Sequence, residues 1–246
     1  MPSFAERPDV PFLSTEQMRE VDRAMIEDYG ILLMQMMENA GRNLAHLARE
    51  RFLDGNPAGR RVLVLAGSGG NGGGGLVCGR RLRNWGAALE VWTAAPPGKF
   101  TEVPRRQLAI LERMGVTSQA AGEDVSLPPA DLIIDALIGY SLRGAPAGAA
   151  AALIRAANAH AAPTLSLDTP SGVDTATGTA HDPAIMAAAT MTLALPKQGL
   201  RSAEAKRAVG ELYLADIGVP PSLYAGPSLG LKVGNIFAQS EIIRLS

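Results

Sequence analysis

The sequence predicts an α/β fold in which helices cover both faces of a mostly parallel sheet. Apolar runs that fit strands alternate with segments of helical periodicity, and this order is typical of parallel sheets. Several of the runs are apolar throughout, as expected of strands buried on both faces. The glycine-rich segment 61–79, RVLVLAGSGGNGGGGLVCG, continues the first of these runs. A strand, a glycine loop and a helix in that order form an anion site in many α/β proteins.

The composition is that of one ordinary globular domain spanning residues 1–246. The chain is 47% apolar and 19% charged, and its net charge is −1. This near-neutral balance argues against a nucleic acid or a membrane held by bulk electrostatics. The single cysteine, Cys78, excludes a disulfide within the chain. Residues 1–13 lack the pattern of a signal peptide, and no apolar stretch is long enough to span a bilayer, so we expect a cytoplasmic protein.

Two amphipathic helices are predicted before the sheet. Ser14 and Gln17 have the spacing of a capping box at the start of the first helix, and Gly30 ends it. The second helix carries an apolar stripe over residues 33–47, which also contains the polar pair Glu38 and Asn39. This pair is either the solvated edge of the helix or a polar pair that faces a pocket. The apolar face of the first helix is expected to consist of Met18, Val21, Met25 and Ile26.

Strands and helices alternate through the remainder of the chain. Strands are predicted at 62–65, 89–93, 131–137, 163–167, 190–195 and 211–214. Further helices are predicted at 76–85, 102–114, 147–159 and 202–209. Residues 1–13 resemble an irregular lead-in, and 221–246 form a C-terminal extension with no readable role. The whole pattern predicts a Rossmann-like, three-layer α/β/α sandwich with the N-terminal helices packed on its sheet.

Polar residues gather where the predicted strands end. Ligands of open α/β sheets bind beyond the carboxyl ends of the strands, so we expect these residues to share one cleft. The cleft combines carboxylates, hydroxyls, an amide, a lysine, an arginine and the backbone N–H groups of the glycine segment. Its candidate side chains are Ser68, Asn71, Asp135, Tyr140, Ser141, Arg143, Asp168, Ser171, Asp174 and Lys197.

The charged candidates each have a structural alternative. Asp168 either caps the turn after its strand or belongs to the site, and Lys197 is either a solvated side chain or a site residue. Asp174 lies in a turn-rich stretch, which favours a structural role. Arg143 fits an exposed position, although a guanidinium beside a glycine loop also suits a phosphate. Cys78 lies on the apolar face of a predicted helix, and we expect it in the core.

Several enzyme classes are disfavoured by what the motifs lack. Segment 67–72 formally matches G-x-G-x-x-G, but residues 93–95, TAA, lack the acid that a nicotinamide-dependent dehydrogenase uses for the ribose. The glycine segment also lacks the Gly-Lys-Ser/Thr ending of a P-loop. No G-x-S-x-G sequence is present, which disfavours the commonest hydrolases of this fold class. The three histidines have no metal-site spacing.

The motifs, taken together and in their order, resemble those of one family. That family is the YjeF N-terminal domain, the NAD(P)H-hydrate epimerases, and the resemblance covers roughly residues 14–220. Motifs that match in sequence order are far more specific than any one of them alone. They are MENAG at 37–41, GSGGNGGGGL at 67–76, DALIGYSL at 135–142, DTPSGVD at 168–174 with Gly178, PKQGL at 196–200 and DIGVP at 216–220.

The resemblance implies an activity, and the site residues that would serve it. The activity is interconversion of the R and S epimers of hydrated NADH or NADPH, so that a separate dehydratase can complete the repair. Asp168 is the implied acid/base group, with Lys197 as a second catalytic charge. A potassium ion is implied at Asn71, Asp135 and Ser171. The implied substrate-binding residues are Gly70, Asn71, Gly72, Gly73, Gly74, Gly139, Tyr140, Ser141, Leu142, Arg143, Gly144, Ala145 and Asp168.

Three positions depart from the family pattern. Gly70 replaces an asparagine, Gly74 replaces an aspartate and Ser141 replaces a glycine. The two extra glycines remove polar atoms, so the alternative is a non-catalytic nucleotide-binding or protein-interaction module on the same fold. The Met-rich segment 34–37 forms either a core layer or a dimer surface, and we expect a homodimer. The motifs do not distinguish NADH hydrate from NADPH hydrate.

Overall fold

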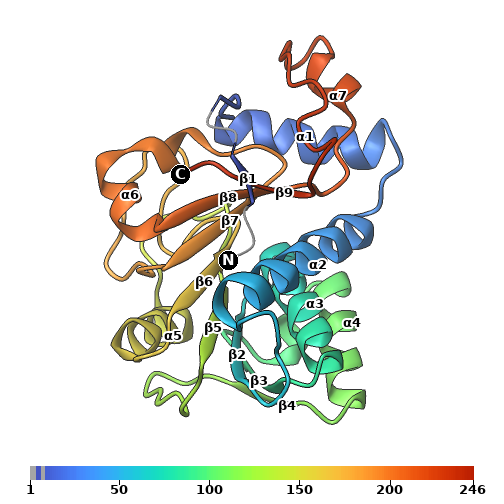
Figure 1. Ribbon diagram of the computed structural model, residues 1–246. Coiled ribbons are helices and arrows are strands. Elements are labelled where there is room, and N and C mark those ends of the chain that lie inside the picture. The colour runs from blue at the N-terminus through green and yellow to red at the C-terminus, as the bar shows by residue number, and fades with distance from the viewer. Residues whose placement is uncertain (1–3, 7–8) are drawn as a thin grey trace.

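A computed structural model, which describes residues 4–6 and 9–246, shows one nine-stranded sheet in the order β1-β9-β8-β7-β6-β5-β2-β3-β4 (Figure 1). Neighbouring strands run parallel except for β8 and β9, which are antiparallel. The expected fold class is therefore confirmed. The strands are β1 (Ala5–Glu6), β2 (Arg61–Ala66), β3 (Ala88–Thr93), β4 (Thr117–Ala120), β5 (Leu132–Ala136), β6 (Thr164–Leu167), β7 (Ala189–Leu193), β8 (Glu211–Ala215) and β9 (Ile242–Arg244).

The helices form a layer on each face of this sheet. Figure 1 shows α2, α3 and α4 on one face and α5 and α6 on the other, while α1 and α7 lie together at one end of the sheet. Their bounds are α1 (Thr15–Glu27), α2 (Leu33–Phe52), α3 (Gly70–Asn84), α4 (Glu102–Arg113), α5 (Gly148–Ala159), α6 (Ala203–Val209) and α7 (Pro221–Ala225), with 3-10 turns at Pro97–Lys99 and Gln198–Arg201. Within the described residues, none of these helices has the length and apolar character needed to cross a bilayer.

The glycine segment is mostly helix, which corrects the expectation of a loop. Helix α3 begins at Gly70, so glycines fill its first two turns. Glycine inside a helix costs roughly 1 kcal/mol relative to alanine, and tertiary packing must offset that cost. Here the packing needs the missing side chains: a Cβ at Gly75 would lie 2.4 Å from the Cβ of Ala136, and one at Gly74 would lie 2.7 Å from Cδ2 of Leu167. Glycine therefore lets α3 approach β5 and β6 closely.

The N-terminal helices follow the sequence prediction except at Ile26 and at Leu33, which begins the predicted apolar stripe of α2 and is 40% exposed. The capping box is confirmed, because the Gln17 N–H donates to Ser14 Oγ at 3.1 Å and the Ser14 N–H donates to Gln17 Oε1 at 2.9 Å. Met25 is fully buried, whereas Ile26, which we expected on the same face, is 43% exposed. Because α1 lies at the end of the sheet beside α7, it buries a narrower stripe than a helix lying on the sheet.

Three short strands were not predicted, and the predicted strands differ slightly at their ends, most of all β7. β4 is polar and largely exposed, β1 has two residues and β9 lies in the C-terminal extension, so each lacks the apolar run on which the prediction depended. β7 ends at Leu193 rather than at residue 195, because Ala194 adopts a positive φ of 62° that no strand accommodates. The extension thus completes the sheet through the antiparallel pairing of β9 with β8.

Candidate active site

A cavity of about 290 Å³ lies beyond the carboxyl ends of the central strands, between the strand-end loops and helices α1 and α2. One wall consists of the loops after β5 and β6 and the first turns of α3. The opposite wall is largely apolar and includes Met18, Leu33, Met36, Met37 and Ala40. Polar side chains that line the cavity are Asp22, Asn71, Tyr140, Ser141 and Asp168.

Asp168 is held at the start of the loop after β6 by two partners. Its Oδ1 accepts a hydrogen bond from Lys197 Nζ, and its Oδ2 accepts one from the Tyr140 N–H at 3.0 Å. The residue has a positive φ of 67°, a conformation that costs energy outside glycine and that often marks functional sites. Asp168 therefore holds the loop after β5 through its bond to Tyr140 and also lines the cavity.

Lys197 is fully buried behind Asp168, which excludes the solvated alternative and leaves that of a site residue. Its Nζ donates to Asp168, to Leu193 O at 3.1 Å and to Thr192 Oγ1 at 3.3 Å. A buried ammonium group is costly unless an opposite charge and hydrogen-bond acceptors surround it, and Lys197 has both. Lys197 is not among the residues that line the cavity. Its place in the structure is that of the counter-charge of Asp168.

The first turn of α3 reaches the cavity through Gly70, Asn71 and Gly74. The Asn71 amide Nδ2 is buried and has no hydrogen-bond partner within the part of the chain that the structure describes. Gly139 packs closely against this turn: a Cβ at Gly139 would lie 3.3 Å from Cγ of Asn71 and 3.0 Å from Oδ2 of Asp168. The glycine thereby brings the loop after β5, the start of α3 and Asp168 together.

Asp135 and Ser171 form a fully buried network beside the cavity wall, next to the loop after β5. Ser171 donates to the Asp135 carboxylate from its Oγ at 2.6 Å and from its N–H at 2.9 Å, and Ser166 Oγ donates at 2.8 Å. Burial raises the pKa of Asp135 and these hydrogen bonds oppose the rise. Across residues 4–6 and 9–246, no lysine or arginine pairs with this carboxylate. The network thus gathers carboxyl and hydroxyl oxygens that no cationic side chain of the described residues approaches.

That donor set fits a monovalent cation. Carboxylate, hydroxyl and amide oxygens are the ligands that hard cations prefer, and a cation would supply the charge that Asp135 lacks. The unpartnered amide of Asn71 supplies a further polar group, since the nitrogen and oxygen of an amide exchange places by a flip.

The remaining residues predicted to bind substrate do not line the cavity. Arg143, Gly144 and Ala145 are exposed, and Leu142 lines a separate hollow. Gly72 and Gly73 are buried inside α3, where a Cβ at Gly73 would lie 2.5 Å from Sδ of Met37. Their role in substrate binding stays a prediction.

Sequence reasoning missed one polar side chain of the cavity, Asp22. It lies on α1, and its Oδ2 accepts a hydrogen bond from the Tyr140 hydroxyl at 2.5 Å. Burial raises the pKa of Asp22, while the hydrogen bond from Tyr140 and the charge of Lys197 lower it. The available signal was an acidic residue directly after Val21, at the edge of the apolar face of a predicted helix.

The other open alternatives are resolved by the contacts. Glu38 and Asn39 are partly exposed and do not line the cavity, which favours the helix-edge alternative over the pocket. Glu38 accepts from Arg80 at 2.6 Å and Asn39 donates to the backbone of Ile217, so the pair also ties α2 to its neighbours. Asp174 accepts from two backbone N–H groups of its own turn, which confirms a structural role. Cys78 is buried in the core, as expected.

The sheet and its cavity define a Rossmann-like α/β protein with a cavity at the carboxyl ends of parallel strands. A family model described as YjeF-related protein N-terminus matches residues 33–199. The chain belongs to this family, which confirms the resemblance seen in the motifs.

Similar proteins extend the match over nearly the whole chain. The NAD(P)H-hydrate epimerase of Dehalogenimonas lykanthroporepellens is 45% identical, over 98% of this chain and 96% of that protein. The bifunctional NAD(P)H-hydrate repair enzyme Nnr of Moorella thermoacetica is 37% identical over 87% of this chain, which spans 41% of that enzyme. The crystal structure of yeast ynu0, YNL200c, superposes with a TM-score of 0.78 at 24% identity, over 96% of this chain and all of that one, and shows the same fold.

Proposed function

We propose that this protein is an NAD(P)H-hydrate epimerase, an isomerase that interconverts the R and S epimers of hydrated NADH or NADPH. The observation that carries the proposal is the 45% identity, over almost the full length of both chains, to a protein of that name. The cavity supports it with an acid/base group, Asp168, whose charge is balanced by a buried lysine. Epimerisation at a hydrated ring carbon requires a proton to leave and return, and a positioned carboxylate serves that purpose.

Each part of the cavity has a role in this reaction. The N-terminal turn of α3 offers backbone N–H groups and positive partial charge to a phosphate of the nucleotide. The apolar wall formed by α1 and α2 excludes water from the ring. Lys197 keeps Asp168 oriented and stabilises its negative charge.

The proposal includes a potassium ion bound by Asn71, Asp135 and Ser171. When bound, it would supply positive charge beside the substrate and offset the buried Asp135 carboxylate. Replacing potassium chloride with choline chloride should then lower the melting temperature of the wild-type protein and leave that of an Asp135→Asn variant unchanged. Equal melting temperatures of the wild-type protein in the two salts would contradict the ion.

We also propose that a separate dehydratase consumes the product. The support is the bifunctional repair enzyme of Moorella thermoacetica, of which this chain matches less than half.

We also propose a cytoplasmic location, which agrees with Cys78 being a free thiol.

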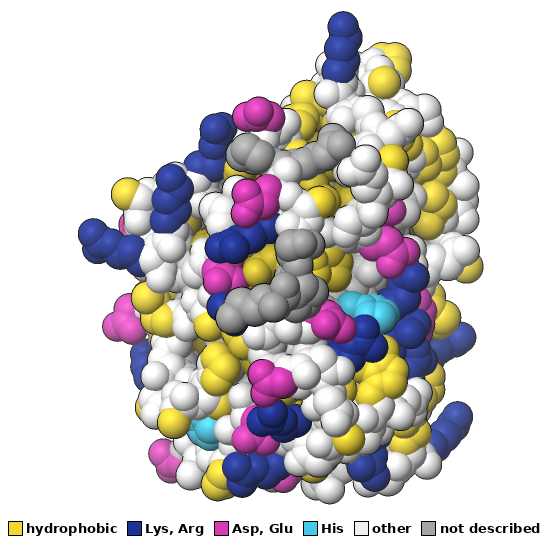
Figure 2. Space-filling view, in the orientation of Figure 1, with side chains coloured by type: hydrophobic (Ala, Val, Ile, Leu, Met, Phe, Trp, Pro, Cys, Tyr) yellow, Lys and Arg dark blue, Asp and Glu magenta, His cyan; other side chains and the backbone are white. Residues whose placement is uncertain are grey.

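A homodimer is the last part of the proposal. The Met-rich segment contributes to the cavity and core, because Met36 and Met37 are buried, so it is not the dimer surface. Large exposed apolar side chains instead gather at the turn between α1 and α2, on the upper right edge of Figure 2. The side chains that form this edge are Ile26, Tyr29, Leu32 and Leu33. We propose that the edge pairs with a second copy of the chain. Light scattering tests the pairing, and a monomeric mass at micromolar concentration would contradict it.

The activity is tested by mixing the protein with one pure epimer of hydrated NADH and following the epimer ratio by chromatography. We expect the wild-type protein to accelerate the exchange above its spontaneous rate, and Asp168→Asn to lose about 10²–10⁴-fold of that rate. Binding of the hydrate by calorimetry without acceleration would establish the non-catalytic module instead. Comparing NADH and NADPH hydrates in the same assay gives the preference.

A further inference from the structure

A second carboxyl group faces the cavity from the helix opposite Asp168. Asp22 lies on α1 and its Oδ2 accepts a hydrogen bond from the Tyr140 hydroxyl at 2.5 Å. Both side chains line the cavity. The Tyr140 hydroxyl thus ties the loop after β5 to α1 across the cavity.

Tyr140 connects this carboxyl group to Asp168. The backbone N–H of Tyr140 donates to Asp168 Oδ2 at 3.0 Å, while its hydroxyl donates to Asp22. The Tyr140 ring lies 5.9 Å from Lys197 Nζ, measured to the ring centroid. The two carboxyl groups are thus held at opposite ends of one tyrosine, and only Asp168 has a cation as its partner.

This difference separates the two groups chemically. Asp168 is ion-paired with the buried Lys197, an arrangement that suits a proton acceptor. Burial raises the pKa of Asp22 and the charge of Asp168 adds to the rise, whereas Tyr140 and Lys197 lower it. The charge of Asp22 also acts on the buried Tyr224 of α7, whose hydroxyl has no hydrogen-bond partner among the described residues. Asp22, whose partner is a hydroxyl and not a cation, suits the role of proton donor.

We propose that Asp22, supported by the Tyr140 hydroxyl, is a second catalytic residue that supplies a proton to the substrate while Asp168 removes one. The inference rests on the epimerase function proposed above. It assigns a role to a residue that none of the motifs used to recognise the family contains.

The proton balance of the step follows from the chemistry of a hydrated nicotinamide. The hydrated carbon bears a hydroxyl group and is bonded to the ring nitrogen. Asp168 takes the hydroxyl proton, a carbonyl forms, and the electron pair of the broken carbon–nitrogen bond stays on nitrogen, which takes a proton from Asp22. Rotation of the carbonyl presents its other face. Reversal of the same transfers then closes the ring in the opposite configuration and returns both protons.

Asp22→Asn is the direct test, because asparagine can still accept the Tyr140 hydrogen bond but cannot donate an acidic proton. We expect its kcat in the single-epimer assay to fall by about 100-fold or more, with KM within about threefold of wild type. The matched control is Asp28→Asn, an exposed carboxylate at the end of the same helix, which should retain the wild-type rate. Circular dichroism checks that both variants are folded.

The pH profile supplies a readout that a purely structural role would not change. If Asp22 donates a proton, the wild-type rate falls as pH rises through its pKa, and this limb is absent in Asp22→Asn. In Tyr140→Phe the limb should move to higher pH, because the Tyr140 hydrogen bond lowers the pKa of Asp22. The Tyr140→Phe profile also tests the proposal if Asp22→Asn does not fold.

The outcomes separate this inference from the function on which it rests. An active wild-type protein whose Asp22→Asn variant matches Asp28→Asn would overturn the role of Asp22 alone. A raised KM with unchanged kcat would do the same, because it indicates a contact rather than proton transfer. A wild-type protein that does not accelerate the exchange would overturn both.

Discussion

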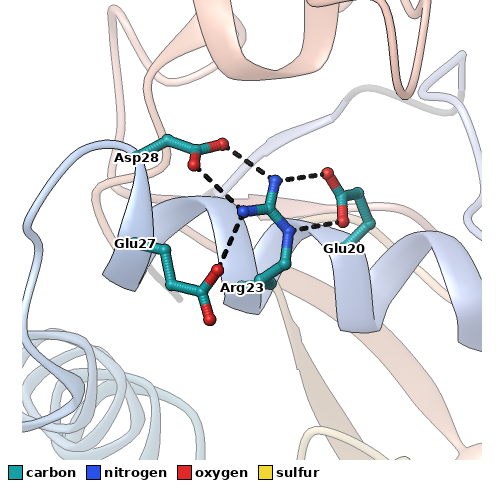
Figure 3. Close-up of polar contacts among 4 residues, drawn as sticks. All are labelled: Glu20, Arg23, Glu27 and Asp28. Carbon is teal, nitrogen blue, oxygen red and sulfur yellow. Dashed lines mark hydrogen bonds and ion pairs between the residues drawn. The ribbon is translucent and has the colours of Figure 1, made fainter.

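Two groups of charges in this molecule make the same kind of contact in opposite surroundings. At the floor of the cavity, Lys197 and Asp168 pair with side chains 0% and 6% exposed. On the outer face of α1, Arg23 binds Glu20, Glu27 and Asp28 at 2.8–3.1 Å while 41% of its side chain remains exposed (Figure 3). Arg23 thus pairs with three carboxylates, whereas Lys197 pairs with one.

The comparison shows that surroundings, and not the number of contacts, decide what an ion pair does. Water and salt screen the Arg23 cluster, so it is expected to contribute little to stability. In the dry floor of the cavity, each charge of the Asp168–Lys197 pair depends on the other. Such a pair is costly to build, and its place beside a cavity agrees with the acid/base role proposed for Asp168.

The largest expected effect comes from breaking the buried pair on one side. Lys197→Met leaves the Asp168 carboxylate buried without its counter-charge, so we expect the free energy of unfolding to fall by about 3–5 kcal/mol in urea titrations. Adding Asp168→Asn to this variant should recover part of the loss, because the uncompensated charge is then gone. Lys206→Met, at an exposed lysine, is the control. A Lys197→Met protein as stable as this control would refute the dependence of each charge on the other.

A pair of intermediate exposure should have an intermediate effect that depends on pH. Arg51 holds Glu211 with two hydrogen bonds of 2.9 Å and lowers the pKa of Glu211 to about 2. The folded-state pKa is below the usual value near 4.5, so the stabilisation is complete above pH 4.5 and is lost as pH falls toward 2. Between pH 5 and 2, the free energy of unfolding should therefore fall less steeply with pH in Glu211→Gln than in the wild-type protein. Identical pH profiles would show that the pair contributes nothing.

The smallest effect is expected at the surface cluster. Arg23→Ala should leave turnover unchanged and shift the urea midpoint little, and 1 M sodium chloride should abolish any shift, because salt screens exposed charges. A large, salt-independent loss of stability would mean that the cluster acts as the buried pair does, and would remove the distinction between the two regions.

The sequence predicted the elements whose patterns are local. Continuous apolar runs located the central strands, and the strand-end motifs located Asp168 and Lys197. Whether Lys197 was solvated or buried was left open, since burial depends on chain segments distant in sequence. Asp22 was missed because its partner, Tyr140, is more than one hundred residues away.

The glycine segment shows the same limit. Seven glycines in nine residues read locally as a loop, because intrinsic propensity disfavours a glycine helix. The close approach of α3 to Ala136 and Leu167, which only the folded sheet provides, stabilises the helix instead. The position of β9 likewise depends on an edge strand that forms elsewhere in the chain.

The most direct test of the account places the two regions in one assay. Wild type, Asp168→Asn and Arg23→Ala are each mixed with a single epimer of hydrated NADH, and the epimer ratio is followed over time. The account predicts rapid exchange by the wild type and Arg23→Ala, and an exchange slowed by about 10²–10⁴-fold in Asp168→Asn. Exchange by Asp168→Asn at the wild-type rate would contradict the central claim that the buried pair carries the chemistry.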